Sequence, residues 1–177
     1  MFRERTRCKL PRTSDLVQII RRFPVAYDAI LTSQQVILCE KYELQQMLRQ
    51  KPSFGGQRGT IVNTASIAGY CIIPTASPYA ASKHAVVALT RCDALRHAQD
   101  AIRINCVSPG AVWTPMLSDG GLPKEFIELG AAMAPMKRYL QPIEVANAIL
   151  FLASPKASAI SGINLPVDCG TQLLRSI

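Results

Sequence analysis

The chain has 177 residues, 49% of them hydrophobic and 18% charged, a composition typical of one folded domain rather than of a disordered chain. Its formal net charge is +8, but residues 1–26 contain seven basic and two acidic residues and therefore carry +5 of that total. A basic charge confined to one end, without interleaved aromatic residues, is not the pattern of a nucleic-acid-binding surface. No apolar run reaches the roughly 18 residues that a membrane span needs, so we expect neither nucleic-acid nor membrane binding.

Residues 1–26 differ in composition from the rest, and we treat them as an atypical basic segment ahead of a single domain that spans residues 27–177. Within this segment, Leu16–Ile20 is compatible with a short strand or with one turn of helix, and its length does not distinguish the two. The next regular stretch, residues 34–50, is rich in Glu, Gln, Leu and Met and lacks Gly and Pro, which predicts a helix.

A loop is predicted from Pro52 to Gly59, and its glycine-rich end resembles a phosphate-binding loop. Such a loop must follow a strand and open a helix, because amides at the helix N-terminus then meet the phosphates. Residues 55–59 precede a predicted strand instead, so we interpret them as a turn.

Strands and helices alternate through the rest of the chain. Ser77 and Pro78 resemble a helix N-cap followed by proline at the first helical position. The predicted elements are strand 60–65, helix 79–97, strand 102–107, an irregular segment over 110–140, helix 142–153 and strand 162–168. This alternation predicts an α/β fold with a parallel sheet.

The six cysteines stand at positions 8, 39, 71, 92, 106 and 169, and no two of them form a C-x-x-C pair. The spacing of a zinc site is therefore missing, and we expect no metal. Several cysteines lie in apolar runs, which is typical of small buried side chains in a reducing compartment. The basic start from Met1 to Arg12 has no apolar stretch like that of a secretory signal. These features predict a cytoplasmic protein.

The residues with the chemistry of a site are Ser66, Tyr79 and Lys83. Tyr79 and Lys83 are four residues apart on a predicted helix and share one face, while Ser66 follows a predicted strand. Active sites of parallel sheets gather at the carboxyl ends of strands. A nearby ammonium favours a phenolate, which then exchanges a proton with a substrate oxygen that a serine hydroxyl also binds. Taken alone, this spacing is equally that of a buried Tyr beside a surface Lys.

Five separated motifs, in order, extend this pattern. They are Gly59–Ser66, Tyr79–Lys83, Asn105–Pro115, Glu144–Ala146 with Phe151–Ser154, and Ser161–Gly162 with Val167–Asp168. Together they closely resemble the short-chain dehydrogenase/reductase family over residues 28–174. The resemblance implies an NAD(P)-dependent oxidoreductase that interconverts a carbonyl and an alcohol, with the cofactor carrying the hydride.

The same resemblance implies a role for each matching residue. Tyr79 would be the general acid/base, Lys83 would favour its phenolate and hold the nicotinamide ribose, and Ser66 would polarise the substrate carbonyl. The nicotinamide would be lined by Pro109, Gly110, Val112 and Thr114. Segment 115–140 would be the substrate lid. Trp113, Met116, Leu117, Leu122 and Phe126 are consistent with an apolar or cyclic small-molecule substrate, and equally with core packing.

The sequence also departs from the family. The glycine-rich loop after the first strand and the Asn-Ala-Gly turn after the fourth are missing. We therefore expect a partial Rossmann-like, doubly wound parallel sheet that keeps the family's strands five to seven, with the N-terminal cofactor-binding half missing. Strand 60–65 would expose a hydrophobic edge, with residues 16–20 as the segment that would partly cover it.

Two single residues depart as well. The family's catalytic asparagine would fall near Thr32 or Gln34, and Cys169 stands where glycine is usual. The choice between NAD and NADP cannot be read, because the deciding residues follow the missing second strand.

Two functional hypotheses remain open. The chain is a working oxidoreductase, with similarity to fungal secondary-metabolism members, or it is a catalytically inactive remnant or an incomplete gene model. The alanine-rich helix 79–97 and helix 34–50 resemble the family's dimer interface, which predicts a homodimer or homotetramer.

Overall fold

The computed structural model describes residues 24–53, 55–71, 76–118, 128, 130–132 and 134–174. Within these residues three parallel strands form one sheet in the order β1 (Gly59–Thr64), β2 (Ile102–Pro109) and β3 (Asn164–Val167). Gly59 lies opposite Ile102, and Cys106 lies opposite Asn164. The three predicted strands and their parallel pairing are confirmed, with ends that differ by one or two residues.

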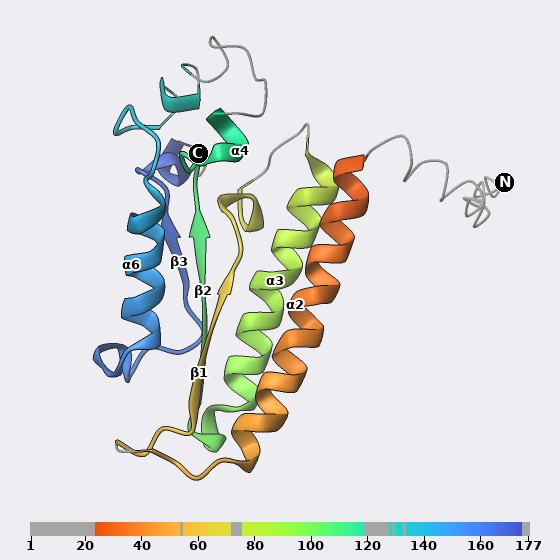
Figure 1. Cartoon of the computed structure of the whole chain (residues 1–177), viewed down its shortest axis with the longest axis vertical. Helices are drawn as coiled ribbons and strands as arrows, with labels where there is room; N and C mark the ends of the chain where they lie inside the picture. Colours follow the sequence, from red (N-terminus) through yellow and green to blue (C-terminus); the bar gives the residue numbers. More distant parts are fainter. Residues whose placement is uncertain are drawn as a thin grey trace, which may run out of the picture.

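Helices cover both faces of this sheet. Helices α2 (Pro24–Arg49) and α3 (Ser77–Arg96) lie side by side on one face, and α6 (Pro142–Ala153) lies on the other (Figure 1). The two helices that resemble the family's dimer-interface pair therefore lie on the same face of the sheet. A short helix, α4 (Pro115–Ser118), follows β2. None of the described helices is both long and apolar enough to cross a membrane.

Helix α2 begins ten residues earlier than predicted. It opens at Pro24, where proline is tolerated because the first amides of a helix have no partner within the helix. The prediction of a start at residue 34 was wrong because Thr32, Ser33 and their neighbours have only modest helix propensity, so their composition does not predict the helix that contains them. The expectation for residues 16–20 lies outside the described residues.

Helix α3 also starts differently from its prediction. Ala76, not Ser77, is the N-cap residue, and no side chain caps the helix. Ser77 is the first helical residue, and Pro78 lies in the first turn. Proline in the first turn is compatible with a helix whether or not a side chain caps it.

The core lies between the sheet and its helices. All of β2 up to Ser108 is buried, because the strand lies between β1 and β3 and has helices on both faces. One cluster joins Leu44 of α2 to Ile61, Ile102 and Ile104. Gly55 and Gly56 have φ of +92° and +77°, which confirms the predicted turn ahead of β1.

Candidate active site

Ser66 lies just beyond the carboxyl end of β1, where it begins a 3-10 turn, η1 (Ile67–Gly69). Its buried hydroxyl oxygen accepts a hydrogen bond from the Ala68 amide at 3.2 Å. That contact fixes the oxygen and leaves the hydroxyl hydrogen available as a donor. Gly69 brings η1 against α3, since a Cβ on it would come within 2.9 Å of the Lys83 carbonyl oxygen.

Lys83 connects α3 to the end of β1. Its Nζ donates to the Thr64 carbonyl at 3.2 Å and lies 5.8 Å from the centroid of the Tyr79 ring. The side chain is buried, and burial lowers the pKa of its ammonium group. No carboxylate of the described residues forms an ion pair with it. The ammonium therefore lies against neutral groups. Its hydrogen-bond acceptor belongs to Thr64, which is two residues before Ser66 in the chain.

The predicted nicotinamide-lining residues follow the carboxyl end of β2. Pro109 is the last residue of the strand, and the Gly110 amide donates to the Val167 carbonyl at 2.9 Å. A Cβ on Gly110 would come within 3.0 Å of Asp168, so close packing of the chain already requires glycine there.

Val112 and Thr114 continue from this point toward the predicted lid. Val112 forms a parallel bridge with Leu140, and the Thr114 carbonyl accepts the Leu117 amide at 2.8 Å. Because β1 and β2 are adjacent and parallel, the segment from Pro109 to Thr114 leaves the sheet at the same end as Ser66.

Thr32 and Gln34 are the positions near which the family's catalytic asparagine would fall. Both lie on α2, and the Gln34 side chain is exposed. Sequence reasoning missed the Thr64 carbonyl, because a main-chain acceptor leaves no signal in residue types. It also missed the function of Asp168. The Asp168 carboxylate accepts the amides of Gly170 at 3.0 Å and Gln172 at 2.7 Å, which fixes the turn after β3.

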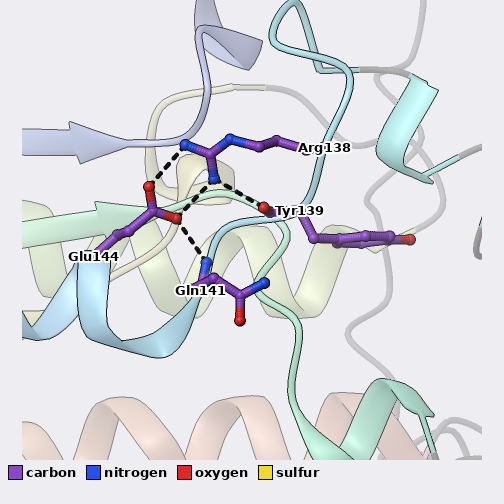
Figure 2. A network of polar contacts seen from close by, with 4 residues as sticks. All are labelled: Arg138, Tyr139, Gln141 and Glu144. Carbon is purple, nitrogen blue, oxygen red and sulfur yellow. Dashed lines mark hydrogen bonds and ion pairs between the residues drawn. The ribbon is translucent and has the colours of Figure 1, made fainter.

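Trp113 lies against Tyr139, with ring centroids 5.6 Å apart. Both rings line a hollow of about 540 Å³ with Arg138 and Glu144. Figure 2 shows Arg138 forming two hydrogen bonds with the Glu144 carboxylate. This carboxylate also accepts a hydrogen bond from the main-chain N–H of Gln141 at the start of α6. These contacts, with Arg138 first, lower the pKa of Glu144 to about 2. Leu122 and Phe126 lie outside the described residues.

A smaller hollow of about 140 Å³ is lined by residues from several segments. Its walls come from the residue after Ser66, the residue after Gly110, and the turn after β3: Ile67, Ala111, Gly130, Ala134, Arg138, Asp168, Cys169 and Thr171. Among the described residues no group of three His, Cys, Asp or Glu side chains could hold a metal ion.

Comparison with known proteins identifies the family. A family model described as enoyl-(acyl carrier protein) reductase matches residues 33–172. The chain is 43% identical to a short-chain dehydrogenase, fogB, from Aspergillus ruber over 129 residues, which are 70% of this chain and 46% of that protein. It is 37% identical to a 2,5-dichloro-2,5-cyclohexadiene-1,4-diol dehydrogenase from Sphingobium indicum over 156 residues, 85% of this chain and 58% of the relative.

Solved structures agree with these relatives. A structure of ElxO with NADPH bound matches with a TM-score of 0.68 and 30% identity, over 78% of this chain and 54% of that chain. The chain thus spans about half the length of the proteins that it matches. The motifs, the parallel sheet and the matched model together show that the chain belongs to the short-chain dehydrogenase/reductase family.

Proposed function

We propose that this chain carries the proton-transfer site of an NAD(P)-dependent oxidoreductase that interconverts an alcohol and a carbonyl. The observation that carries the proposal is the buried ammonium of Lys83, which donates to the Thr64 carbonyl, two residues before Ser66, and lies near the Tyr79 ring. A cation without a carboxylate partner is costly to bury. Such a cost is typical of groups retained for function.

In the proposed reaction the Tyr79 hydroxyl exchanges a proton with the substrate oxygen. The Ser66 hydroxyl donates a hydrogen bond to the same oxygen, since its own oxygen is already fixed by the Ala68 amide. The Lys83 ammonium favours the Tyr79 phenolate electrostatically. The bound cofactor, NAD or NADP, supplies or accepts the hydride.

The residues of this chain fit the nicotinamide end of that cofactor. The Lys83 ammonium has three N–H donors, and its one hydrogen-bond acceptor among the described residues is the Thr64 carbonyl. The remaining donors suit ribose hydroxyls. We assign the cofactor-facing surface to Tyr79, Lys83, Pro109, Gly110, Val112 and Thr114.

A small cyclic alcohol is the proposed substrate class. The smaller hollow has the apolar residues Ile67, Ala111, Ala134 and Cys169 in its walls, together with Arg138, Asp168 and Thr171. This mixture suits a small molecule that has both apolar carbons and hydroxyl groups. One relative is named for a cyclohexadiene-diol. A place in secondary metabolism and a cytoplasmic location remain predictions.

The alternative is a catalytically inactive remnant or an incomplete gene model. It is favoured by two observations: β1 is an edge of the described sheet, and the glycine-rich loop of this chain forms a turn before that strand. The described residues include no glycine-rich loop that opens a helix, the arrangement in which helix N-terminal amides bind a pyrophosphate.

A chimera separates the two. The N-terminal part of the Sphingobium relative that this chain does not match is fused ahead of Tyr27, and cis- and trans-1,2-cyclohexanediol are offered with NAD⁺ and with NADP⁺. We expect formation of reduced cofactor, followed by its absorbance at 340 nm, and at least a tenfold loss with Ser66→Ala. A folded chimera that binds cofactor but reduces none would contradict the proposal and support the inactive remnant.

We also propose that the chain self-associates through α2 and α3. Leu38 and Tyr42 lie one turn apart on α2 and are 53% and 63% exposed, and Leu95 of α3 is 83% exposed. Apolar side chains exposed together on a helix pair are typical of an interface between copies.

A further inference from the structure

The hollow beside Trp113 is a second cavity, which the proposed reaction does not use. Its volume is about 540 Å³, and its walls come from the segment after β2 and from the residues that lead into α6. The described residues that line it include none of Ser66, Tyr79 and Lys83. A ligand in this hollow would therefore occupy a site of its own.

One wall of the hollow is aromatic. The rings of Trp113 and Tyr139 have centroids 5.6 Å apart, and their planes are inclined by 55°. Trp113 is 39% exposed even with this contact. An exposed indole next to a second ring is suited to stacking with the planar ring of a ligand.

Main-chain contacts fix the positions of both rings. The Trp113 amide donates to the Leu140 carbonyl at 2.8 Å, and the Leu140 amide donates to the Ala111 carbonyl at 3.0 Å. The Tyr139 hydroxyl lies against Gly130, where a Cβ would collide with it. A ligand would meet rings that are already placed, which lowers the entropy cost of binding.

The rest of the lining carries one net positive charge, because Lys137 and Arg138 face the single carboxylate of Glu144. Arg138 and Glu144 neutralise each other through two hydrogen bonds, and the Tyr139 ring extends away from that pair (Figure 2). The exposed Lys137 ammonium donates to the Ala132 carbonyl at 2.7 Å, its one hydrogen-bond acceptor among the described residues. Its other two N–H donors remain for an anion.

The backbone at Lys137 supplies a separate observation. Its φ is +54°, in the left-handed region, and its amide donates to the Ala134 carbonyl at 2.8 Å. A turn that served only the fold would be less strained with glycine at this position. Strain of this kind is concentrated at sites that bind ligands, so the lysine at this turn favours a binding role.

We propose that this hollow binds a planar aromatic carboxylate, with the ring stacked on Trp113 and the carboxylate on the Lys137 ammonium. The ring matches the aromatic wall, and one negative charge matches the one cation that has no carboxylate partner. An aliphatic acid lacks the ring, and an aromatic alcohol lacks the charge. The proposal does not depend on the proposed function, since neither residue takes part in the proton transfer.

The fluorescence of Trp113 tests the proposal directly, because this residue is the only tryptophan of the chain. Benzoate is titrated into the full chain, and cyclohexanecarboxylate and benzyl alcohol serve as matched ligands without the aromatic ring or without the charge. We expect a saturable change with a Kd on the order of 1 mM for benzoate. The other two ligands should bind about fivefold more weakly or not at all.

Variants at the cation separate a specific contact from general charge attraction. Lys137→Gln should weaken benzoate binding by about fivefold, the upper end of what an exposed ion pair contributes, and Lys137→Arg should restore it. Lys156→Gln is the matched control, because Lys156 is an exposed lysine of η3 (Pro155–Ala157), beyond the other end of α6. It should leave benzoate binding unchanged.

Three outcomes would overturn the proposal. Equal affinities for benzoate and cyclohexanecarboxylate would rule out stacking on Trp113. Equal losses in Lys137→Gln and Lys156→Gln would show attraction by net charge only. No saturable change with benzoate would rule out the site itself, and the ligand comparison on the unmodified chain decides this even for a variant that does not fold.

Discussion

Cys169 has a backbone conformation that usually belongs to glycine. Its φ is +54°, in the left-handed region, while its side chain is buried against Ala134 and Leu140. The turn is fixed by the Asp168 carboxylate, which holds the amides of Gly170 and Gln172. The departure from the family's glycine therefore changes the residue and keeps the turn.

At position 169 we expect the glycine variant to be more stable than the alanine variant, which reverses the usual order of their stabilities. A Cβ in the left-handed region costs roughly 1–2 kcal/mol, whereas elsewhere glycine is the less stable of the two. We expect Cys169→Gly to have a free energy of unfolding about 1 kcal/mol above that of Cys169→Ala, measured by urea denaturation. An alanine variant as stable as the glycine variant would show that the turn relaxes.

Glu40 is a buried carboxyl that the proposed reaction does not use. Asn63 donates from Nδ2 to Glu40 Oε2 at 3.1 Å and to Thr90 Oγ1 at 2.9 Å, while Oε1 has no partner among the described residues. Burial raises the pKa of Glu40, and Asp93 and Glu43 raise it further against the opposing effects of Asn63 and His97.

This raised pKa predicts the direction of a pH effect. Since the folded pKa lies above the unfolded one, near 4.5, Glu40 stabilises the fold most below that value, and this contribution is lost as pH rises through the folded pKa. Glu40→Gln should therefore gain stability over the unmodified chain between pH 4.5 and 8, by on the order of 1 kcal/mol. Thermal unfolding of both proteins across this range measures the gain. A stability difference that does not change with pH would refute the burial argument.

At the scale of elements, the strands and α6 were predictable from sequence, and the starts of α2 and α3 were not. Strand segments such as Thr60–Ala65 are short, rich in β-branched residues and bounded by turn residues, and helix 142–153 was predicted with the bounds that it has. The start of α2 at Pro24 lies in a stretch of modest helix propensity, and the N-cap at Ala76 involves no side-chain bond. Neither leaves a local signal.

The outer faces of α2 and α3 give a prediction about association. Leu38→Glu with Tyr42→Glu places charge on the exposed apolar surface of α2 and should weaken self-association at least tenfold in sedimentation velocity. Leu150→Glu is the matched control, because Leu150 is similarly exposed, at 68%, on α6 across the sheet. A chain that is monomeric before any substitution would contradict the proposed interface.

At the scale of the whole molecule, the sequence singled out the candidate site residues but not the contacts that hold them. Motif order identified Ser66, Tyr79 and Lys83, because each motif follows a strand or occupies one helix face. The burial of Lys83, its bond to the Thr64 carbonyl and the packing of Gly69 against α3 arise from contacts between distant segments. Such contacts are visible only once the sheet and α3 are assembled.

The most direct test of the proposed site is the turnover of the chimera with and without Tyr79→Phe. Phenylalanine keeps the ring beside the Lys83 ammonium and removes the exchangeable proton, so binding of reduced cofactor should change little. General acid/base groups contribute about 10²–10⁴-fold, and we predict a loss of kcat in that range for cyclohexanediol oxidation. A Tyr79→Phe chimera that retains kcat within a few-fold of its parent would contradict the assignment of proton transfer to this site.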